Sequence, residues 1–112
     1  MEKTPTVYML AKGYHSTLYT GVTSDLVARI YQHREEVTPG YTSHYGIKRL
    51  VWFETGGSMD GAIAYEKRLK RWLREWKYAL IEKENPTWRD LAEDFGFEPL
   101  MKRKADPGSG PG

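Results

Sequence analysis

Apolar and polar stretches divide the first half of the chain into strand-sized segments. Residues 6–11 (TVYMLA) form an apolar, β-branched and aromatic run that predicts a buried strand. The polar, glycine-containing stretch 12–16 predicts a turn, and residues 17–23 (TLYTGVT) predict the second strand of a hairpin. Residues 49–54 (RLVWFE) predict a third strand, which the sequence TGGS ends.

Helical spacing of apolar residues follows the hairpin and the third strand. Good N-cap residues precede three of the four helical patterns. The residue before Pro86 resists helical backbone, which ends the penultimate helix. The predicted helices cover residues 25–36, a segment from Ser58 or Asp60 to 72, residues 75–83, and a short segment capped by Thr87 that runs through 94 with Trp88 and Leu91 inward. Residues 37–46 are rich in proline and glycine and predict a loop.

The order of these elements is β-β-α-β-α-α, with a short last helix. This order predicts an α/β (α+β) fold in which a small three-stranded antiparallel sheet is flanked by helices. A chain of 112 residues is the size of one domain. We expect that domain to cover residues 6–98, and the Gly/Pro/Ser-rich residues 99–112 to form a disordered tail.

Composition excludes several classes of protein. With 39% hydrophobic and 29% charged residues the chain resembles an average globular protein rather than a disordered one. No apolar run approaches the ~20 residues of a membrane span, and the opening residues MEKTPTVYML lack the pattern of a secretory leader. The absence of cysteine excludes disulfides, thiol catalysis and cysteine–zinc sites. These features predict a cytoplasmic protein without a membrane segment.

Charge is distributed unevenly although the net charge is only +2. Residues 62–77 carry six basic and two acidic side chains, whereas residues 82–98 carry two basic and six acidic ones. A basic face favours a polyanionic partner, but two solvated helix surfaces would give the same pattern.

Common catalytic motifs are missing from the sequence. It contains no phosphate-binding glycine-rich loop, no nucleophile elbow and no metalloprotease helix motif. His15, His33 and His44 lie in different contexts without ligand spacing, which argues against a zinc site.

Three smaller features carry candidate chemistry. Tyr8 and Tyr19 lie on paired strands, so their phenol groups share a face if they stand opposite each other, although tyrosine is also a common half-buried strand residue. Arg29 and His33 are four residues apart and share a helix face, in a site or at an ordinary surface. Glu66 stands among apolar neighbours and is either a paired structural charge or a ligand for a hard cation.

Together these groups suit the hydrolysis of a phosphodiester with one divalent ion. A carboxylate such as Glu66 can hold Mg²⁺ or Mn²⁺, and Arg29 can stabilise charge on the phosphate. A tyrosine could take a proton from the attacking water, but its ordinary pKa of about 10 requires a cationic neighbour or a relay, for which His33 is the candidate.

The sequence resembles the GIY-YIG nucleases, a family named for two short strand motifs about ten residues apart. The matching segments are Val7-Tyr8-Met9, Tyr19-Thr20-Gly21, the helix with Arg29 and His33, the helix with Glu66, and Asn85-Pro86. The resemblance covers roughly residues 6–91 and is greatest to small stand-alone bacterial members. Departures from the name motif fall at strand packing positions such as Val7, Met9 and Thr20.

The resemblance implies a role for each matched residue. Tyr8 would act as general base, Tyr19 as its companion near the phosphate, Arg29 as phosphate stabiliser and His33 as proton relay. Glu66 would be the sole protein ligand of Mg²⁺ or Mn²⁺, and Asn85 would order the site. It also accounts for Gly21, where the backbone must come close to packed neighbours.

The sequence carries no appended DNA-binding domain, so contacts to nucleic acid must come from this domain. The expected backbone-contacting residues are basic: Lys67, Lys70, Arg71, Arg74, Lys77, Lys48 and Arg49. Such contacts predict weak, salt-sensitive, non-specific DNA binding. Tyr45, Trp52 and Trp76 could stack on unpaired bases if exposed, but tryptophans are also common core residues.

Three hypotheses follow. The first is a divalent-metal-dependent DNA endonuclease acting in repair or processing. The second is a non-catalytic nucleic-acid-binding module that retains the nuclease fold, and the third is a docking domain in which the tyrosines are only core. No obligate protein partner is evident, and the protein is expected to be a monomer or homodimer.

Overall fold

The computed structural model describes residues 3–35 and 46–100. These residues form strands β1 (Thr6–Ala11), β2 (Leu18–Thr23) and β3 (Arg49–Thr55), helices α1 (Leu26–Glu35), α3 (Met59–Lys70) and α4 (Arg74–Glu84), and the 3-10 helix η1 (Leu91–Phe95). Both strand pairings are antiparallel, which confirms the predicted α+β fold with a three-stranded sheet and the order β-β-α-β-α-α.

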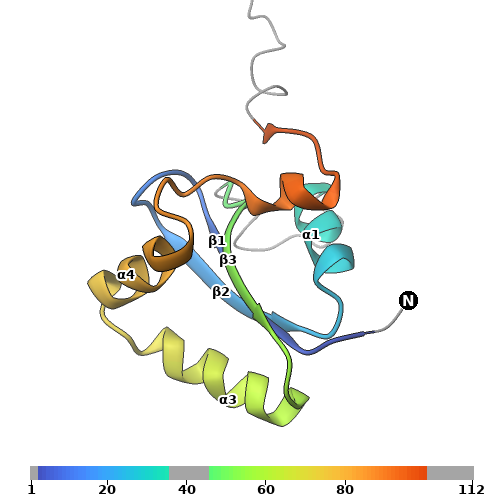
Figure 1. Ribbon diagram of the computed structural model, residues 1–112, viewed down its shortest axis with the longest axis vertical. Helices are drawn as coiled ribbons and strands as arrows, with labels where there is room; N and C mark the ends of the chain where they lie inside the picture. Colours follow the sequence, from blue (N-terminus) through green and yellow to red (C-terminus); the bar gives the residue numbers. More distant parts are fainter. Residues whose placement is uncertain (1–2, 36–45, 101–112) are drawn as a thin grey trace, which may run out of the picture.

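The first strand in the sequence is the central strand of the sheet, whose order is β2-β1-β3. Figure 1 shows α1 and η1 on one side of the sheet and α3 and α4 on the other. All six residues of β1 are therefore buried, which explains why TVYMLA is apolar throughout rather than alternating.

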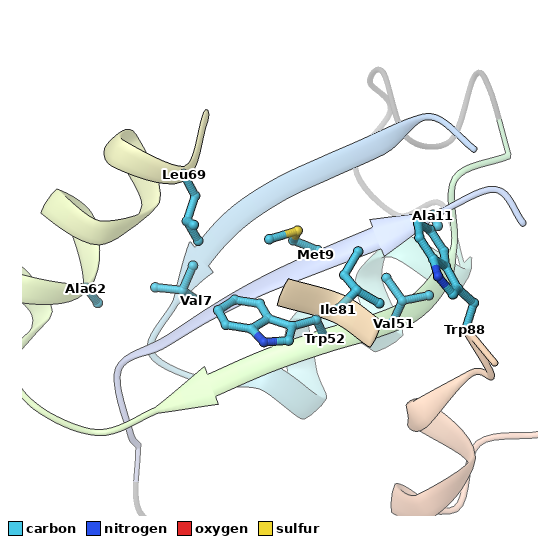
Figure 2. Close-up of a cluster of buried hydrophobic side chains, with 9 residues drawn as sticks. All are labelled: Val7, Met9, Ala11, Val51, Trp52, Ala62, Leu69, Ile81 and Trp88. Atoms are coloured by element: carbon cyan, nitrogen blue, oxygen red, sulfur yellow. The ribbon is translucent and has the colours of Figure 1, made fainter. Parts of the chain in front are cut away.

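Alternate residues of β1 enter two separate cores. Val7, Met9 and Ala11 pack with residues of β3, α3 and α4, as Figure 2 shows for Leu69 of α3 and Ile81 of α4. Tyr8 and Leu10 point the other way and pack with Leu26 and Ile30 of α1. The period of two in a strand thus assigns Tyr8 to the face that α1 covers.

Side-chain caps set where two of the helices begin. The Asp25 carboxylate accepts a hydrogen bond of 3.1 Å from the Ala28 amide ahead of α1, and the Ser58 hydroxyl accepts one of 3.0 Å from Gly61 at the start of α3. Ser58 rather than Asp60 is therefore the cap of α3.

The prediction that Thr87 caps a last helix is wrong. Trp88 has the left-handed backbone angle φ 61°, which no helix can include, so the chain turns once more before Asp90 caps the 3-10 helix η1. The inward position of Trp88 is confirmed, because its side chain is fully buried.

A β-bulge interrupts the pairing of β1 with β3. Met9 pairs with Trp52 and Leu10 with Leu50, which leaves Val51 without a partner residue on β1. The Val51 carbonyl accepts a hydrogen bond of 3.0 Å from Asn85 Nδ2, and the Leu50 amide donates one of 3.1 Å to Asp90 Oδ1. Side chains from the segment after α4 thus satisfy the backbone that the bulge leaves unpaired.

A buried ion pair connects the same segment to α1. Arg34 Nη2 lies 2.7 Å from Asp90 Oδ2, and the two side chains are 4% and 6% exposed. Arg34 Nε also donates to the Lys48 carbonyl. The Asp90 carboxylate therefore holds α1, β3 and η1 together.

Gly21 is the residue of β2 that pairs with Tyr8. A Cβ at this position would lie 2.6 Å from both Cζ and Oη of Tyr8 and 3.0 Å from Cε2 of Tyr19. The Tyr8 ring therefore lies across the glycine backbone, which confirms the close approach expected at Gly21.

Several predictions fall outside the described residues. They are the loop at 37–46 apart from Gly46, the tail from residue 101 onward, and Tyr45 and His44. Within the described part of the chain, no helix is long and apolar enough to cross a membrane.

Removing the Asp90 carboxylate should destabilise the fold strongly. In Asp90→Ala the Arg34 charge stays buried without its partner and the Leu50 amide loses its acceptor, so we expect a loss of about 3–5 kcal/mol in the free energy of unfolding. Urea denaturation followed by circular dichroism measures this. Asp94→Ala is the matched control, because its pair with Arg89 lies at the surface and its loss should hardly move the midpoint. Equal effects of the two substitutions would contradict the role given to Asp90.

Adding a methyl group at Gly21 should displace the Tyr8 ring. We expect Gly21→Ala to lower the free energy of unfolding by about 1–3 kcal/mol, because the ring or the β2 backbone must move. Urea denaturation gives the energy, and the NMR shifts of the Tyr8 ring report the displacement. Gly13→Ala, whose added Cβ would meet no atom within 4 Å, serves as the control. An unmoved Tyr8 ring in Gly21→Ala would refute the close approach.

Candidate active site

A tyrosine and a histidine meet on the α1 side of the sheet. Tyr8 Oη of β1 lies 3.1 Å from Nε2 of His33 on α1. The Tyr19 ring of β2 is centred 6.2 Å from the Tyr8 ring and 5.6 Å from the imidazole of His33. Tyr8 pairs with Gly21 and Tyr19 pairs with Leu10, so the two tyrosines share a face as diagonal neighbours rather than directly opposite each other.

Helix α1 supplies the other two groups of this cluster. Leu26 and Ile30 are buried against the sheet, and Arg29 and His33 follow beside this apolar stripe, one helical turn apart and both half-buried. The Arg29 guanidinium lies close enough to Tyr8 and His33 to affect the pKa of both. Tyr8, Tyr19, Arg29 and His33 are hereafter called the phenol–imidazole cluster.

Burial shifts the pKa values of Tyr8 and His33 in opposite directions. It raises the pKa of the Tyr8 phenol well above its ordinary value, as does Tyr19, while Arg29 lowers it in part. Burial and then the Arg29 charge lower the pKa of His33 below its ordinary 6.5. At neutral pH the phenol therefore keeps its proton and the imidazole is neutral. A neutral imidazole can accept at Nε2 the proton that the phenol donates.

Glu66 lies on a different face of the sheet. It belongs to the buried side of α3, together with Ala62 and Leu69, which pack with Val7 and Met9 on the face of β1 opposite Tyr8. Helix α3 lies against both β1 and the edge strand β2. The structure thus brings four predicted site residues together and places the predicted metal ligand across the sheet from them.

The surroundings of the Glu66 carboxylate are compatible with a hard divalent ion. Glu66 is 8% exposed, and its Oε2 pairs with Nζ of Lys70, whose side chain is 54% exposed. The other carboxylate oxygen has no protein partner among the described residues. No group of three His, Asp or Glu side chains in the described part of the chain could enclose a metal. A lone carboxylate suits Mg²⁺ or Mn²⁺, which keep several waters, and does not suit zinc.

Both ends of the Asn85 side-chain amide form hydrogen bonds with the backbone. Its Nδ2 donates to the Val51 carbonyl and, at 2.9 Å, to the Arg89 carbonyl, and its Oδ1 accepts from the Arg89 amide at 3.1 Å. The side chain is 3% exposed. Asn85 therefore fixes the segment after α4 to the bulge of β3, and no contact with the phenol–imidazole cluster accompanies these bonds.

The predicted nucleic-acid contacts differ in their exposure. Lys77 is half-buried. The exposed basic side chains among these contacts are those of Lys67, Lys70, Arg71 and Arg74. Lys48 and Arg49 form hydrogen bonds within the protein, to the carbonyls of Arg34 and Trp88. The exposed basic residues line α3, α4 and the link between them, on the side of the sheet away from Tyr8.

The two tryptophans predicted to stack on bases also differ in exposure. Trp52 is 4% exposed and belongs to the core, whereas Trp76 is 55% exposed next to Trp72 on the basic side. Only Trp76 of these can meet an unpaired base.

One cluster was not predicted. In the β1–β2 turn the Tyr14 ring stacks on His15, and His15 in turn stacks on Tyr78 of α4. Glu82 Oε2 lies 2.5 Å from His15 Nε2. Sequence spacing gives no signal for it, because 67 residues separate His15 from Glu82.

The chain matches known proteins over most of its length. The family model of the GIY-YIG catalytic domain matches residues 4–79. A UPF0213 protein from Aeromonas salmonicida is 32% identical over 78 residues, which cover 70% of this chain and 57% of the relative, so the chain aligns with little more than half of that relative's length. The solution NMR structure of a UPF0213 protein from Bacillus halodurans superposes with a TM-score of 0.50 at 27% identity, covering 80% of this chain and 95% of that one.

These matches agree with the fold and with the position of the two tyrosine motifs on neighbouring strands. The match to the family model spans all three strands, α1, α3 and the first half of α4. This chain belongs to the GIY-YIG family and has its nuclease fold.

Proposed function

We propose that this protein is a divalent-metal-dependent endonuclease that hydrolyses phosphodiester bonds in DNA, in repair or processing. The observation that carries the proposal is the contact of 3.1 Å between Tyr8 Oη and His33 Nε2 beside Arg29 and Tyr19, inside a GIY-YIG domain. A fold core requires neither a guanidinium nor an imidazole at a buried phenol, whereas the hydrolysis of a charged ester requires both a proton acceptor and a cation.

The proton path begins at Tyr8 and ends at His33. Because its pKa is raised by burial, Tyr8 cannot act as a phenolate base at neutral pH. It can take a proton from the attacking water only while passing its own proton to Nε2 of His33. The lowered pKa of His33 keeps this imidazole in its accepting form at neutral pH.

Arg29 and Tyr19 handle the phosphate in this proposal. The guanidinium of Arg29 is half-buried and would form paired hydrogen bonds with the phosphate oxygens as negative charge builds on them. The half-buried Tyr19 hydroxyl would donate to the same group from the adjoining strand. Both residues bind and orient the phosphodiester, which is where much of the rate of phosphoryl transfer arises.

Glu66 would hold the metal through its one carboxylate. When bound, Mg²⁺ or Mn²⁺ supplies Lewis-acid polarisation of the phosphate and stabilisation of the leaving oxygen. The carboxylate oxygen that does not pair with Lys70 would bind the ion, and the exposed Lys70 side chain can move away from the other oxygen.

A non-catalytic nucleic-acid-binding module is the second candidate function. The ion pair of Glu66 with Lys70 favours it, because a carboxylate neutralised by a lysine has less need of a metal. In this case the predicted contacts Lys67, Lys70, Arg71, Arg74 and Lys77 would bind the phosphate backbone without cleavage.

Cleavage assays separate the two functions. We expect supercoiled and branched DNA to be cut in the presence of Mg²⁺ or Mn²⁺ and not after chelation. Tyr8→Phe and His33→Ala should each lower the rate about 10²- to 10⁴-fold, because the proton path is broken, and Glu66→Gln should abolish cleavage. Glu84→Gln, an exposed carboxylate of α4, is the matched control. Cleavage that survives Glu66→Gln and Tyr8→Phe would come from a contaminant, and binding without any cleavage would establish the second function.

The cleavage rate should fall in acid through protonation of His33. The folded state disfavours the imidazolium, so below pH 6.5 the unfolded chain binds more protons at His33 than the folded chain does. As the pH falls beneath 6.5, His33 therefore loses its ability to accept a proton, and the free energy of unfolding decreases. We expect the acid limb of the pH–rate profile to have a midpoint below 6.5 and to match the NMR titration of His33. Urea denaturation at each pH separates inactivation from unfolding. An acid limb centred above 6.5 would exclude His33 as the acceptor.

A further inference from the structure

Three rings stack at the turn between β1 and β2, outside the phenol–imidazole cluster. The Tyr14 ring lies parallel to the His15 imidazole, with centroids 4.0 Å apart and an angle of 8° between the planes. The other side of His15 stacks on Tyr78 of α4 at 4.8 Å and 21°. Trp88 presents its ring edge-on to all three.

Hydrogen bonds hold this stack rigidly. Glu82 Oε2 accepts from His15 Nε2 and, at 2.7 Å, from Trp88 Nε1. His15 and Trp88 have φ angles of 51° and 61° and are the non-glycine residues with left-handed backbone in the described part of the chain. Such backbone persists only where the surroundings fix it, and here the shared carboxylate does so.

The outer ring of the stack is open. Tyr14 is 62% exposed although one face of its ring is covered by His15. The exposed face of the Tyr14 ring buries no apolar surface, so it does not stabilise the fold. Such a face can stack with another flat aromatic ring.

A cationic hollow lies beside the stack. It has a volume of about 280 Å³ and is lined by Ser16, Thr17, Leu18, Trp72, Arg74 and Lys77. Ser16 follows His15 directly, and its carbonyl accepts a hydrogen bond of 3.2 Å from Tyr78 Oη, so the stack and the hollow are parts of one structure. Ser16 is two residues from Tyr14, or at most ~7 Å along the chain.

Positive charge is concentrated at this hollow. Partial burial and the nearby Lys70 lower the pKa of Lys77, and Arg74 adds a second cation to the lining. No acidic side chain is among the lining residues. An anion that enters the hollow relieves this repulsion.

We propose that Tyr14 and the hollow form a nucleotide subsite, in which a base stacks on Tyr14 and the adjoining phosphate lies between Arg74 and Lys77. A nucleotide has a flat ring joined to a phosphate over a short distance, and so matches both parts of the subsite. An acidic peptide would supply the negative charge but not the flat ring. The inference rests on the proposed function, because it takes this nucleotide to be part of a nucleic-acid substrate. Such a subsite would hold the strand whatever its sequence, because stacking tolerates any base.

Binding of a short fluorescent single-stranded oligodeoxynucleotide in chelator tests the subsite without cleavage. We expect Tyr14→Ala to weaken binding about 5- to 150-fold, the range for loss of one stacked base, and Tyr14→Phe, which keeps the ring, to bind like the parent. Tyr31→Ala removes an exposed tyrosine of α1 and should leave binding unchanged. Arg74→Ala should weaken binding and reduce its salt dependence, whereas Lys83→Ala, an exposed lysine of the same helix, should do neither.

Competition with small probes identifies the ligand class. A 5′-mononucleotide should displace the oligonucleotide at lower concentration than inorganic phosphate or the free nucleoside does, and Tyr14→Ala should remove this difference. The proposal is overturned if Tyr14→Ala binds like Tyr31→Ala, if Tyr14→Phe binds as weakly as Tyr14→Ala, or if inorganic phosphate competes as well as the mononucleotide.

The binding result is independent of cleavage. Loss of binding in Tyr14→Ala, with no cleavage by the parent protein, would keep the subsite and reject the nuclease. Cleavage by the parent together with unchanged binding in Tyr14→Ala would reject the subsite alone. Urea denaturation of Tyr14→Ala and Arg74→Ala confirms that each variant is folded.

Discussion

The Asp90 carboxylate makes the interaction that fixes α1, β3 and η1 relative to one another. It receives hydrogen bonds from the Leu50 amide of β3 and the Ala92 amide of η1, and its second oxygen pairs with Arg34 of α1. A carboxylate with no such partners could not stay 7% exposed inside a protein. Its burial is possible because all three donors converge on it, and their convergence requires α1, β3 and η1 to take one arrangement.

This constraint reaches the candidate site through α1. Arg34 follows His33 directly and lies five residues after Arg29, so fixing Arg34 near the end of the helix sets the rotation of the whole helix about its axis. At that rotation Leu26 and Ile30 face the sheet and His33 meets Tyr8. An ion pair outside the cluster therefore determines the distance between the two groups that would exchange a proton.

Local patterns predicted the three strands and the first three helices, and they placed pairs of candidate residues together. The period of two in β1 and β2 placed Tyr8 and Tyr19 on one face, and the four-residue spacing placed Arg29 and His33 on one helix face. Neither pattern contains the register, which set Tyr8 opposite Gly21 instead of Tyr19. Packing of the Tyr8 ring decided that register, and only a glycine leaves room for it.

Contacts between residues distant in sequence could not be predicted. Asp90 and Asn85 stand in a polar segment whose most visible signals were a proline and a candidate helix cap, yet both side chains bind the bulge in β3. The bulge itself leaves no mark on the apolar run that contains Val51. Likewise nothing local links His15 to Glu82, because the ring stack exists only after α4 has packed beside the β1–β2 turn.

The sheet separates the phenol–imidazole cluster from Glu66 and the exposed basic residues of α3 and α4, and the sheet is narrow. Tyr8 and His33 lie on the α1 face, whereas Glu66 and the basic residues lie with α3 and α4 on the other. Adjacent strands are only ~4.8 Å apart, and β2, which carries Tyr19, is an edge strand. A phosphodiester that lies along the edge of β2 is one strand away from Tyr8 and next to the helix that carries Glu66. Under the proposed function, a phosphodiester bound along this edge would therefore be within reach of both Tyr19 and the helix that carries Glu66.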